Sequence, residues 1–365
     1  MSDKIVLNNW VGDNLHIDSD IGRLDGCNKD WNMIITERET GKTTLMLKKA
    51  YNMFKRYKKP SILIRRYQTD ITDMYIDDLL KTINEFTNSN LEFNYKKGQL
   101  KEGGQLDVKI NGFDKVFLRI IALNAPLSRL KSMRLDSVKY MFFDEFICNK
   151  RIGERYLNDE PLRLKEIRKT YLRYTDNIKI YCFGNPYSLY NPIFSDKNVN
   201  TNDLYPGAFI NKDNYCIWCY QLKPELRAKL LEKDKDFQFD EAYKRYAFDG
   251  RAIQDADIRV LDKQPEGFRL EFILKIHNKH IGVYHGCILG ADKLFYWCKL
   301  LNHEEISKKR SIVCFDFGDM ANRTILINND YKKMYAMLKE SIEHRWVAFN
   351  SIEESWLLEE IYQEI

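Results

Sequence analysis

Apolar residues along the first half of the chain alternate between short continuous runs and longer stretches with helical spacing. The short runs predict strands, at 31–35, 61–66, 138–143 and 178–183. The longer stretches place apolar residues every three or four positions and predict helices, at 45–54, 69–86 and 161–174. Strands that alternate with helices in this way predict a parallel α/β sheet.

The pattern changes further along the chain. Polar and apolar residues alternate over 91–122, which predicts a small hairpin insertion. Residues 223–248 are charged and rich in helix formers, which is typical of a connector. Beyond it, the pattern predicts a meander of two or three strands followed by two more strands and two helices, at 268–300, 311–317, 323–328, 330–343 and 352–363. We therefore predict three parts: an α/β domain at 1–220, a helical linker at 221–255 and an α+β domain at 256–365.

Composition agrees with two globular domains, because 365 residues exceed the roughly 150 of a typical domain and 44% of them are hydrophobic. The net charge of +5 is unevenly distributed. Residues 51–200 contain 27 basic and 18 acidic side chains. Residues 301–365 contain 8 basic and 12 acidic side chains. This distribution predicts a basic working surface in the first half of the chain and none at its end.

Several classes of protein are disfavoured by the sequence. The first 20 residues contain four Asp and no apolar core of a secretory signal. No apolar run reaches the roughly 18 residues of a membrane span, so we predict no membrane partner. Cys216 and Cys219 form a CxxC without a second pair, and they are interpreted as core residues of a strand with reduced thiols. His277 and His280 are interpreted as surface residues, and no structural metal is expected.

The nine residues after the first strand suggest a phosphate-binding loop that opens a helix. They are Thr36, Glu37, Arg38, Glu39, Thr40, Gly41, Lys42, Thr43 and Thr44. A helix N-terminus offers unpaired N–H groups to phosphate, Lys42 can reach the β- and γ-phosphates, and the Thr43 hydroxyl can ligate Mg²⁺. Thr36 stands where the motif has glycine, and by itself the loop is also compatible with a chance Gly-Lys-Thr at a helix start.

A second element favours the nucleotide interpretation. The strand at 138–143 runs into Asp144 and Glu145, which supply a carboxylate for Mg²⁺ and a neighbour that orients the attacking water. The two signatures occur in order with a strand–helix unit between them. We therefore predict a P-loop NTPase of the additional-strand, catalytic-glutamate division, with a RecA/FtsK-like parallel sheet. This division is dominated by helicases, translocases and packaging motors.

Two further features bear on hydrolysis. Asn185 follows the strand at 178–183 and could sense the γ-phosphate, although a simple Gly-Asn-Pro turn is the alternative. Phosphoryl transfer also uses a cation, commonly supplied by a neighbouring subunit. The composition does not choose among the basic candidates, which are Arg129, Lys131, Arg134, Arg163, Arg168 and Arg173.

Three segments together resemble a known family. Ile62-Leu-Ile-Arg-Arg-Tyr67, Phe143-Asp-Glu-Phe146 and Cys182-Phe-Gly-Asn-Pro186 are similar to the DNA-packaging ATPases of small protein-primed tailed phages of the phi-29 type, which are relatives of terminase large subunits. The resemblance implies an ATP- and Mg²⁺-dependent motor that forms a homomeric ring, a pentamer, at a procapsid portal. It implies double-stranded DNA and a packaging RNA as partners. It also implies action in the cytoplasm of the infected host cell, transiently at the portal and not as a stable virion component.

The resemblance also implies roles for individual residues. Arg38 matches the arginine of the family's phosphate loop, and Asn185 its coupling residue. Lys131 falls thirteen residues before Asp144, at a lysine that acts on the neighbour's nucleotide, and Arg173 falls at the trans-acting arginine. Lys42, Thr43, Asp144 and Glu145 match the family's catalytic and Mg²⁺-binding residues. Two alternatives remain: a helicase or conjugation-type translocase, and a non-hydrolysing nucleotide-binding scaffold.

The second domain corresponds in position to the RNase H-like nuclease of terminases, which needs several carboxylates around two metals. Asp316 and Asp319 are its only close pair on a strand end. We therefore predict a vestigial RNase H-like fold without nuclease activity that docks DNA, portal or RNA. Lys308-Lys-Arg310 is either a contact for such a partner or an ordinary solvated loop.

Overall fold

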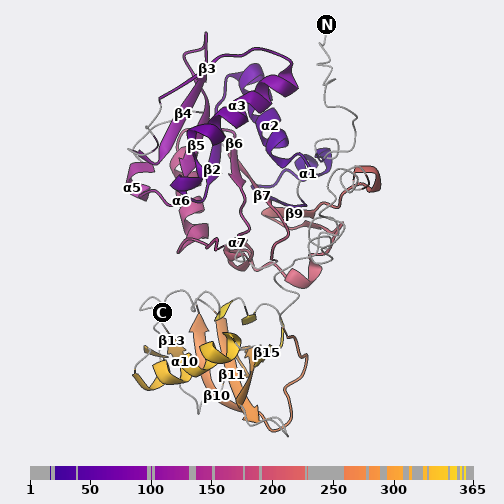
Figure 1. Cartoon of the computed structure of the whole chain (residues 1–365), viewed down its shortest axis with the longest axis vertical. Coiled ribbons are helices and arrows are strands. Elements are labelled where there is room, and N and C mark those ends of the chain that lie inside the picture. Colours follow the sequence, from indigo (N-terminus) through magenta and orange to yellow (C-terminus); the bar gives the residue numbers. More distant parts are fainter. Residues whose placement is uncertain are drawn as a thin grey trace. The chain divides into compact units, whose positions relative to one another are not determined.

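The computed structural model divides the chain into two compact units, Met1–Ile253 and Gln254–Ile365 (Figure 1). We describe each unit by itself. The residues that the structure describes are 17, 21–37, 40–96, 100, 103–130, 137–149, 153–175, 177–188, 191–226, 228, 259–276, 279–287, 294–306, 312–314, 324–326, 329–343, 346–351, 354–355 and 357–358.

The described residues of the first unit contain one sheet, with strand order β3-β4-β5-β2-β6-β7-β1-β9-β8. Its strands are β1 (Trp31–Ile35), β2 (Ser61–Arg65), β3 (Phe93–Tyr95), β4 (Gln105–Ile110), β5 (Val116–Ala122), β6 (Tyr140–Asp144), β7 (Lys179–Gly184), β8 (Phe209–Asn211) and β9 (Tyr215–Cys219). The central strands from β5 to β9 in this order are parallel, and β3, β4 and β8 are antiparallel to their neighbours. The parallel α/β sheet predicted from the sequence is thus confirmed.

The strand predicted at 178–183 has the position that decides the class of fold. As β7 it lies between β1 and β6, with Tyr181 in register with Asn32 on one side and with Phe142 on the other. The strand that precedes the phosphate loop is therefore separated from the strand that carries the acidic pair. This inserted strand is the structural mark of the additional-strand division that the sequence analysis predicted.

The segment predicted as a separate hairpin insertion is part of the sheet. β3 and β4 pair antiparallel as expected, but β5 pairs in parallel with β2, from Ser61 opposite Leu118 to Arg65 opposite Ala122. Leu118, Ile120 and Ile121 are buried in the main core. Alternation along the sequence predicted a two-stranded hairpin here, whereas the segment holds three strands, and alternation carries no information about the strand with which β5 pairs.

Helices cover the sheet. They are α1 (Gly22–Gly26), α2 (Lys42–Tyr57), α3 (Asp73–Thr87), α5 (Leu127–Leu130), α6 (Glu160–Leu172) and α7 (Pro192–Asp196), with 3₁₀ turns at Gln68–Asp70 and Thr201–Asp203. α2 packs against α3 and against β2, β5 and β6. Buried aromatic residues of β6 and β7, among them Phe142, Phe143 and Phe183, fill the centre of the core.

The second unit contains a mixed sheet in the order β14-β13-β10-β11-β12-β15 among its described residues. Its elements are β10 (Arg269–Ile276), β11 (Lys279–Cys287), β12 (Leu294–Leu300), β13 (Ile312–Cys314), β14 (Thr324–Leu326), α10 (Asn329–Glu343) and β15 (Val347–Phe349). The first three strands form the predicted antiparallel meander, and β13, β14 and β15 add parallel pairs. The sequence analysis did not anticipate β15, which is only three residues long.

Some predictions concern residues outside the described ranges. Most of the linker at 221–255 lies there, as do His277, the segment Lys308-Lys-Arg310, and both Asp316 and Asp319. The vestigial nuclease character of the second unit therefore stays a prediction. Cys216 and Cys219 are buried in β9, as expected for core residues. No helix within the described residues has the length and apolar character needed to cross a membrane.

Candidate functional site

Four adjacent parallel strands bring the predicted site residues to one edge of the sheet. β1 ends at Ile35 before the phosphate loop, β2 ends at Arg65, β6 ends at Asp144 and β7 ends at Gly184 before Asn185. Parallel strands have their carboxyl ends at the same edge, where open α/β sheets bind ligands. Lys42 and Asn185, which are 143 positions apart in the chain, thus meet at this edge.

The phosphate loop accommodates Thr36 because that position needs no left-handed backbone. Thr36 continues from β1, donates its backbone N–H to Gly184 O at 3.0 Å, and is absent from the described residues with positive φ. Among the loop residues that the structure describes, the left-handed one is Gly41, with φ 85° at the N-cap of α2, where a side chain would be strained. The departure from glycine at 36 is therefore compatible with a loop that turns at Gly41. Arg38 and Glu39 lie outside the described residues.

Lys42 lies across the loop from its position in the first turn of α2. Its Nζ donates to Thr36 O at 3.3 Å, to Glu37 O at 2.5 Å and to Asn185 Oδ1 at 2.7 Å. Asp144 lies opposite Phe183 of β7, two residues before Asn185, so the acidic residue and the asparagine lie at the ends of adjacent strands. The predicted lysine, acidic residue and coupling asparagine therefore form one cluster beside the N-terminus of α2.

Glu37 is a buried carboxylate within the loop. Its Oε2 accepts a hydrogen bond from Thr36 Oγ1 at 3.1 Å, and its Oε1 is buried without a hydrogen-bond partner among the described residues. Burial raises its pKa to about 7, against the lowering effect of neighbouring hydrogen bonds and of Lys42. A larger neutral fraction at physiological pH reduces repulsion between this side chain and bound phosphates. The sequence named Glu37 as a loop residue but did not predict this burial.

Glu37→Gln is expected to change how stability depends on pH. Because the folded-state pKa is about 7 and the ordinary value is 4.5, the unfolded chain loses this proton first. The contribution of Glu37 to the free energy of unfolding is complete below about pH 4.5. It falls by up to about 3 kcal/mol as the pH rises to 7. Urea unfolding at pH 5 and pH 8 should show a smaller decrease for Glu37→Gln than for the wild type. Glu85→Gln, at an exposed site on α3, is the control, and equal decreases for all three proteins would contradict the assignment.

The acidic pair is bound by an arginine from the neighbouring strand. Arg65 donates from Nη1 to Asp144 Oδ2 at 2.9 Å and from Nη2 to Glu145 Oε2 at 2.6 Å. Burial raises the pKa of Asp144 and the Arg65 charge lowers it. Asp144 is buried, whereas the Glu145 side chain is 46% exposed. Asp144 is thus suited to a fixed metal ligand, and Glu145 can face a reacting water.

A cavity of about 290 Å³ opens beside this pair. It is lined by Arg65, Arg66, Tyr67, Asp70, Asp144, Glu145 and Glu154. The Thr43 hydroxyl and the Asp144 carboxylate are oxygen donors of the kind that Mg²⁺ prefers, and Mg²⁺ commonly takes only one or two protein ligands beside phosphate and water. By the chemistry of these two donors the residues fit Mg²⁺ bound together with a nucleotide; of the two, Asp144 lines the cavity and Thr43 does not. No group of three or more His, Cys, Asp or Glu within the described ranges could hold a metal ion without such help.

The basic candidates for a trans-acting residue separate into groups. Arg163 donates to the carbonyls of Leu123 and Ala125, and Arg168 pairs with Asp30 at 2.9 Å, so both hold their own subunit together. Arg173 is exposed at the C-cap of α6. Lys131 and Arg134 lie outside the described residues. Arg129, in α5, is exposed as well, so exposure leaves Arg129 and Arg173 as the described candidates for contact with a neighbour.

The sequence analysis assigned no role to two arginines of this site. Arg65 and Arg66 were quoted only as part of a family motif, although Arg65 contacts both acidic residues and Arg66 is buried behind them. The available signal was a pair of consecutive arginines at the end of an apolar strand. Such a position at the carboxyl edge of a parallel sheet favours contact with the ends of adjacent strands.

Comparison with known proteins identifies the family. A model of the Podovirus DNA encapsidation protein (Gp16) family matches residues 22–355. The chain belongs to this family. The resemblance to phi-29-type packaging proteins inferred from three short segments is thereby confirmed.

Two curated relatives and two solved structures show how far the likeness extends. The DNA packaging protein of Bacillus phage phi29 is 27% identical over 321 residues, which cover 84% of this chain and 85% of that protein. The DNA packaging protein of Bacillus phage PZA gives the same values. The structure of the Phi-28 gp11 DNA packaging motor has a TM-score of 0.62 at 17% identity, covering 92% of this chain and 94% of that one. The phi-29 genome packaging motor assembly has the same TM-score at 18% identity, covering 94% and 97%. The fold is thus shared across both units.

Proposed function

We propose that this protein is a Mg²⁺-dependent ATPase that drives double-stranded DNA into a procapsid through its portal. The observation that carries the proposal is that Asp144, Glu145 and Asn185 follow the ends of two adjacent strands, while Lys42 from the first turn of α2 contacts Asn185. Membership of a DNA encapsidation family supports the packaging role. The relatives named as DNA packaging proteins, and the solved packaging motors, support action as a ring at the portal.

Nucleotide binding is assigned to the phosphate loop. The N-terminal N–H groups of α2 and the Lys42 ammonium would bind the phosphates. In the structure the acceptors of Lys42 Nζ are the carbonyls of Thr36 and Glu37 and Asn185 Oδ1. On nucleotide binding, phosphate oxygens would replace these acceptors. Because Asn185 loses its partner in this exchange, nucleotide binding alters a contact at the end of β7. This supports the coupling role of Asn185.

Hydrolysis is assigned to the acidic pair. Thr43 and Asp144 would hold Mg²⁺, which supplies positive charge to the β- and γ-phosphate oxygens. Glu145, half exposed at the rim of the cavity, would orient a water and accept its proton. Its bond to Arg65 leaves Oε2 engaged, so Glu145 must release or share that bond to act.

Partners, location and the second unit belong to the same proposal. The protein would act as a homomeric ring, a pentamer, with Arg173 and Lys131 reaching the neighbour's nucleotide, and with a packaging RNA between ring and portal. It would work in the infected host cytoplasm and not remain in the virion. The second unit, after a linker at 221–255, would dock partners without nuclease activity.

One assay separates this function from the two alternatives. ATP hydrolysis is measured with and without long duplex DNA, and strand separation is read by a fluorescent strand in the same tube. We expect Mg²⁺-dependent hydrolysis that duplex DNA stimulates, without strand separation. Strand separation would indicate a helicase, and ATP binding without turnover would indicate a scaffold. Added salt should reduce the stimulation strongly, because contacts with phosphates release counterions.

Arg65→Met is expected to shift the acidic limb of the pH–rate profile to higher pH. The Arg65 charge lowers the pKa of the buried Asp144, so its loss raises that pKa. A protonated carboxylate does not bind Mg²⁺, and activity should therefore fall at a higher pH than in the wild type. The profile is measured from pH 5.5 to 8.5 at saturating ATP and Mg²⁺. Lys109→Met on β4 is the control, and an acidic limb that stays in place in Arg65→Met would refute this role for Arg65.

A further inference from the structure

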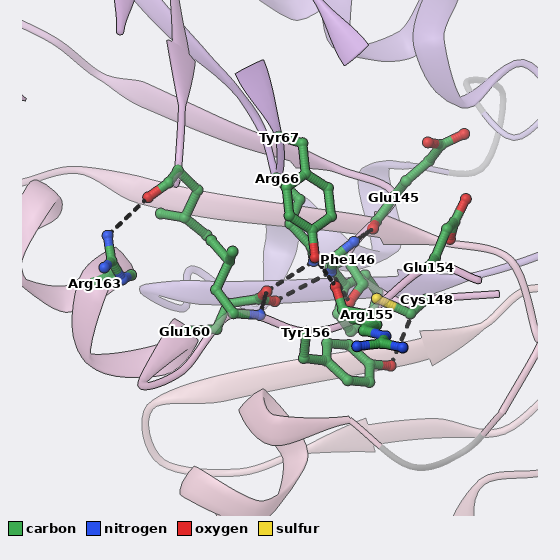
Figure 2. A network of polar contacts seen from close by, with 12 residues as sticks. Arg66, Tyr67, Glu145, Phe146, Cys148, Glu154, Arg155, Tyr156, Glu160 and Arg163 are labelled. Carbon is green, nitrogen blue, oxygen red and sulfur yellow. Dashed lines mark hydrogen bonds and ion pairs between the residues drawn. The ribbon is translucent and has the colours of Figure 1, made fainter. Parts of the chain in front are cut away.

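A second buried arginine lies behind the catalytic carboxylates. Arg66 is 4% exposed and Glu160 is completely buried, and they form a two-pronged ion pair (Figure 2). Arg66 Nε donates to Glu160 Oε2 at 2.7 Å, and Nη2 donates to Oε1 at 3.1 Å. The guanidinium carbon also lies over the rings of Phe143 and Tyr156, at 5.3 and 5.1 Å from their centroids. The ion pair and the two ring contacts together restrict the orientation of the guanidinium.

The other edge of the guanidinium binds the backbone of the turn that follows β6. Arg66 Nη1 donates to Glu145 O at 2.8 Å, and Nη2 donates to Phe146 O at 2.8 Å. Figure 2 shows the Glu145 carboxylate pointing away from the ion pair, so the contact is with the Glu145 backbone alone. Arg66 lines the cavity beside the acidic pair, and through these two bonds it holds the peptide units that orient the Glu145 side chain.

This turn has a backbone conformation that needs to be held. Glu145 has φ 56°, in the left-handed region that non-glycine residues rarely adopt and that costs on the order of 1–3 kcal/mol. The direction in which Glu145 projects depends on this conformation. Phe146 N–H also donates to Phe183 O at 3.0 Å, and Asn191 Nδ2 donates to Phe146 O at 2.7 Å. Of these contacts, only those of Arg66 reach the carbonyl of Glu145 itself.

The same ion pair ties the turn to α6. Glu160 is the first residue of α6, and its carboxylate also accepts the Leu157 N–H at 3.2 Å. α6 ends at Leu172, and its C-cap is Arg173, one of the two exposed candidates for contact with a neighbour. A single buried contact therefore connects the backbone of Glu145 with the start of the helix whose end bears Arg173.

We propose that Arg66 is a positioning residue for ATP hydrolysis, which fixes the left-handed turn at Glu145 and joins it through Glu160 to α6. The inference rests on the proposed ATPase function and extends it. Stability alone does not account for such a pair, because buried ion pairs can often be replaced by apolar residues at no loss of stability. The planar guanidinium, in contrast, donates hydrogen bonds to a carboxylate and to two carbonyls at once, which neither lysine nor an apolar side chain can do.

The test compares Arg66→Lys with a matched variant elsewhere. Arg119→Lys breaks another buried two-pronged pair, with Asp107 at 2.6 and 2.7 Å, and Arg119 also contacts α6 through the Tyr171 hydroxyl at 3.2 Å. It does not contact the Glu145 turn through any of these bonds. We expect Arg66→Lys to lower kcat per folded protein about 10- to 100-fold with the KM for ATP within about 2-fold, since a misplaced catalytic group can cost that much. Arg119→Lys should retain its kcat. Equal losses of kcat in both would overturn the proposal.

A second variant tests whether misfolding could explain a loss of kcat. The double replacement Arg66→Met with Glu160→Leu removes both charges together, so it leaves neither one buried and unpaired. Its melting temperature should stay near that of the wild type, while its kcat falls as in Arg66→Lys. Wild-type kcat in this folded double variant would also overturn the proposal.

A third measurement does not depend on turnover. Amide hydrogen exchange is followed in the full chain, in peptides that cover 145–149 and 157–163. We expect Arg66→Lys to increase exchange in both peptides together, and Arg119→Lys in neither. If the wild type does not hydrolyse ATP, the proposed function is wrong. The exchange pattern then still tests whether Arg66 connects the Glu145 turn to α6. Unchanged exchange at 145–149 would refute the link whatever the rate of hydrolysis.

Discussion

Glu145→Gln is expected to reduce kcat for ATP hydrolysis about 10²- to 10⁴-fold while ATP binding remains near the wild-type level. Glutamine has the same shape and can still accept the hydrogen bond that Arg65 donates to Oε2, so the turn should keep its geometry. It cannot accept a proton from water at neutral pH. The loss should therefore fall on turnover and not on affinity.

The measurement combines steady-state hydrolysis with binding of a fluorescent ATP analogue. Glu154→Gln is the matched control, because Glu154 lines the same cavity and its Oε2 accepts the Asn149 N–H at 2.6 Å. It should retain its turnover. Normal hydrolysis by Glu145→Gln, or an equal loss of kcat in Glu154→Gln, would show that Glu145 does not have the assigned role.

Lys42→Ala is expected to weaken both ATP binding and turnover. Lys42 supplies the ammonium of the phosphate loop, and hydrogen bonds to charged groups contribute about 1.5–3 kcal/mol. Loss of one or two such bonds corresponds to a decrease in ATP affinity of about 10- to 100-fold or more. The variant also loses the Lys42 contacts to Thr36 O, Glu37 O and Asn185 Oδ1, which leaves the loop less ordered before ATP arrives.

Lys49→Ala is the control for Lys42→Ala. Lys49 lies on the same helix, and its Nζ pairs with Asp25 at 2.6 Å, away from the phosphate loop. Titration calorimetry with ATP and Mg²⁺ should find weaker binding only in Lys42→Ala. An unchanged ATP affinity in that variant would show that the loop does not bind phosphate through Lys42. Mixing Lys42→Ala with Arg173→Ala subunits should partly restore hydrolysis if Arg173 acts across a subunit interface.

Local features of the chain were readable from sequence because they depend on residues close together. Apolar runs and helical spacing located β1, α2, β2 and α6 to within a few residues. The Gly41-Lys42-Thr43 and Asp144-Glu145 segments predicted the nucleotide chemistry that we propose. Each of these signals lies within one turn of helix or one strand. The sequence thereby determined the class of fold, the family and the position of most candidate site residues.

The tertiary structure decided which of these elements are neighbours. It placed β7 between β1 and β6, paired β5 with β2, and buried Glu37. It also placed Arg66 against Glu145 and Glu160, which lie 79 and 94 positions further along the chain. Periodicity identifies the face of a strand that is buried but not the strand beside it, because pairing depends on how the whole sheet closes. The partners of Arg65 and Arg66 follow from that strand order and could be assigned only from the folded sheet.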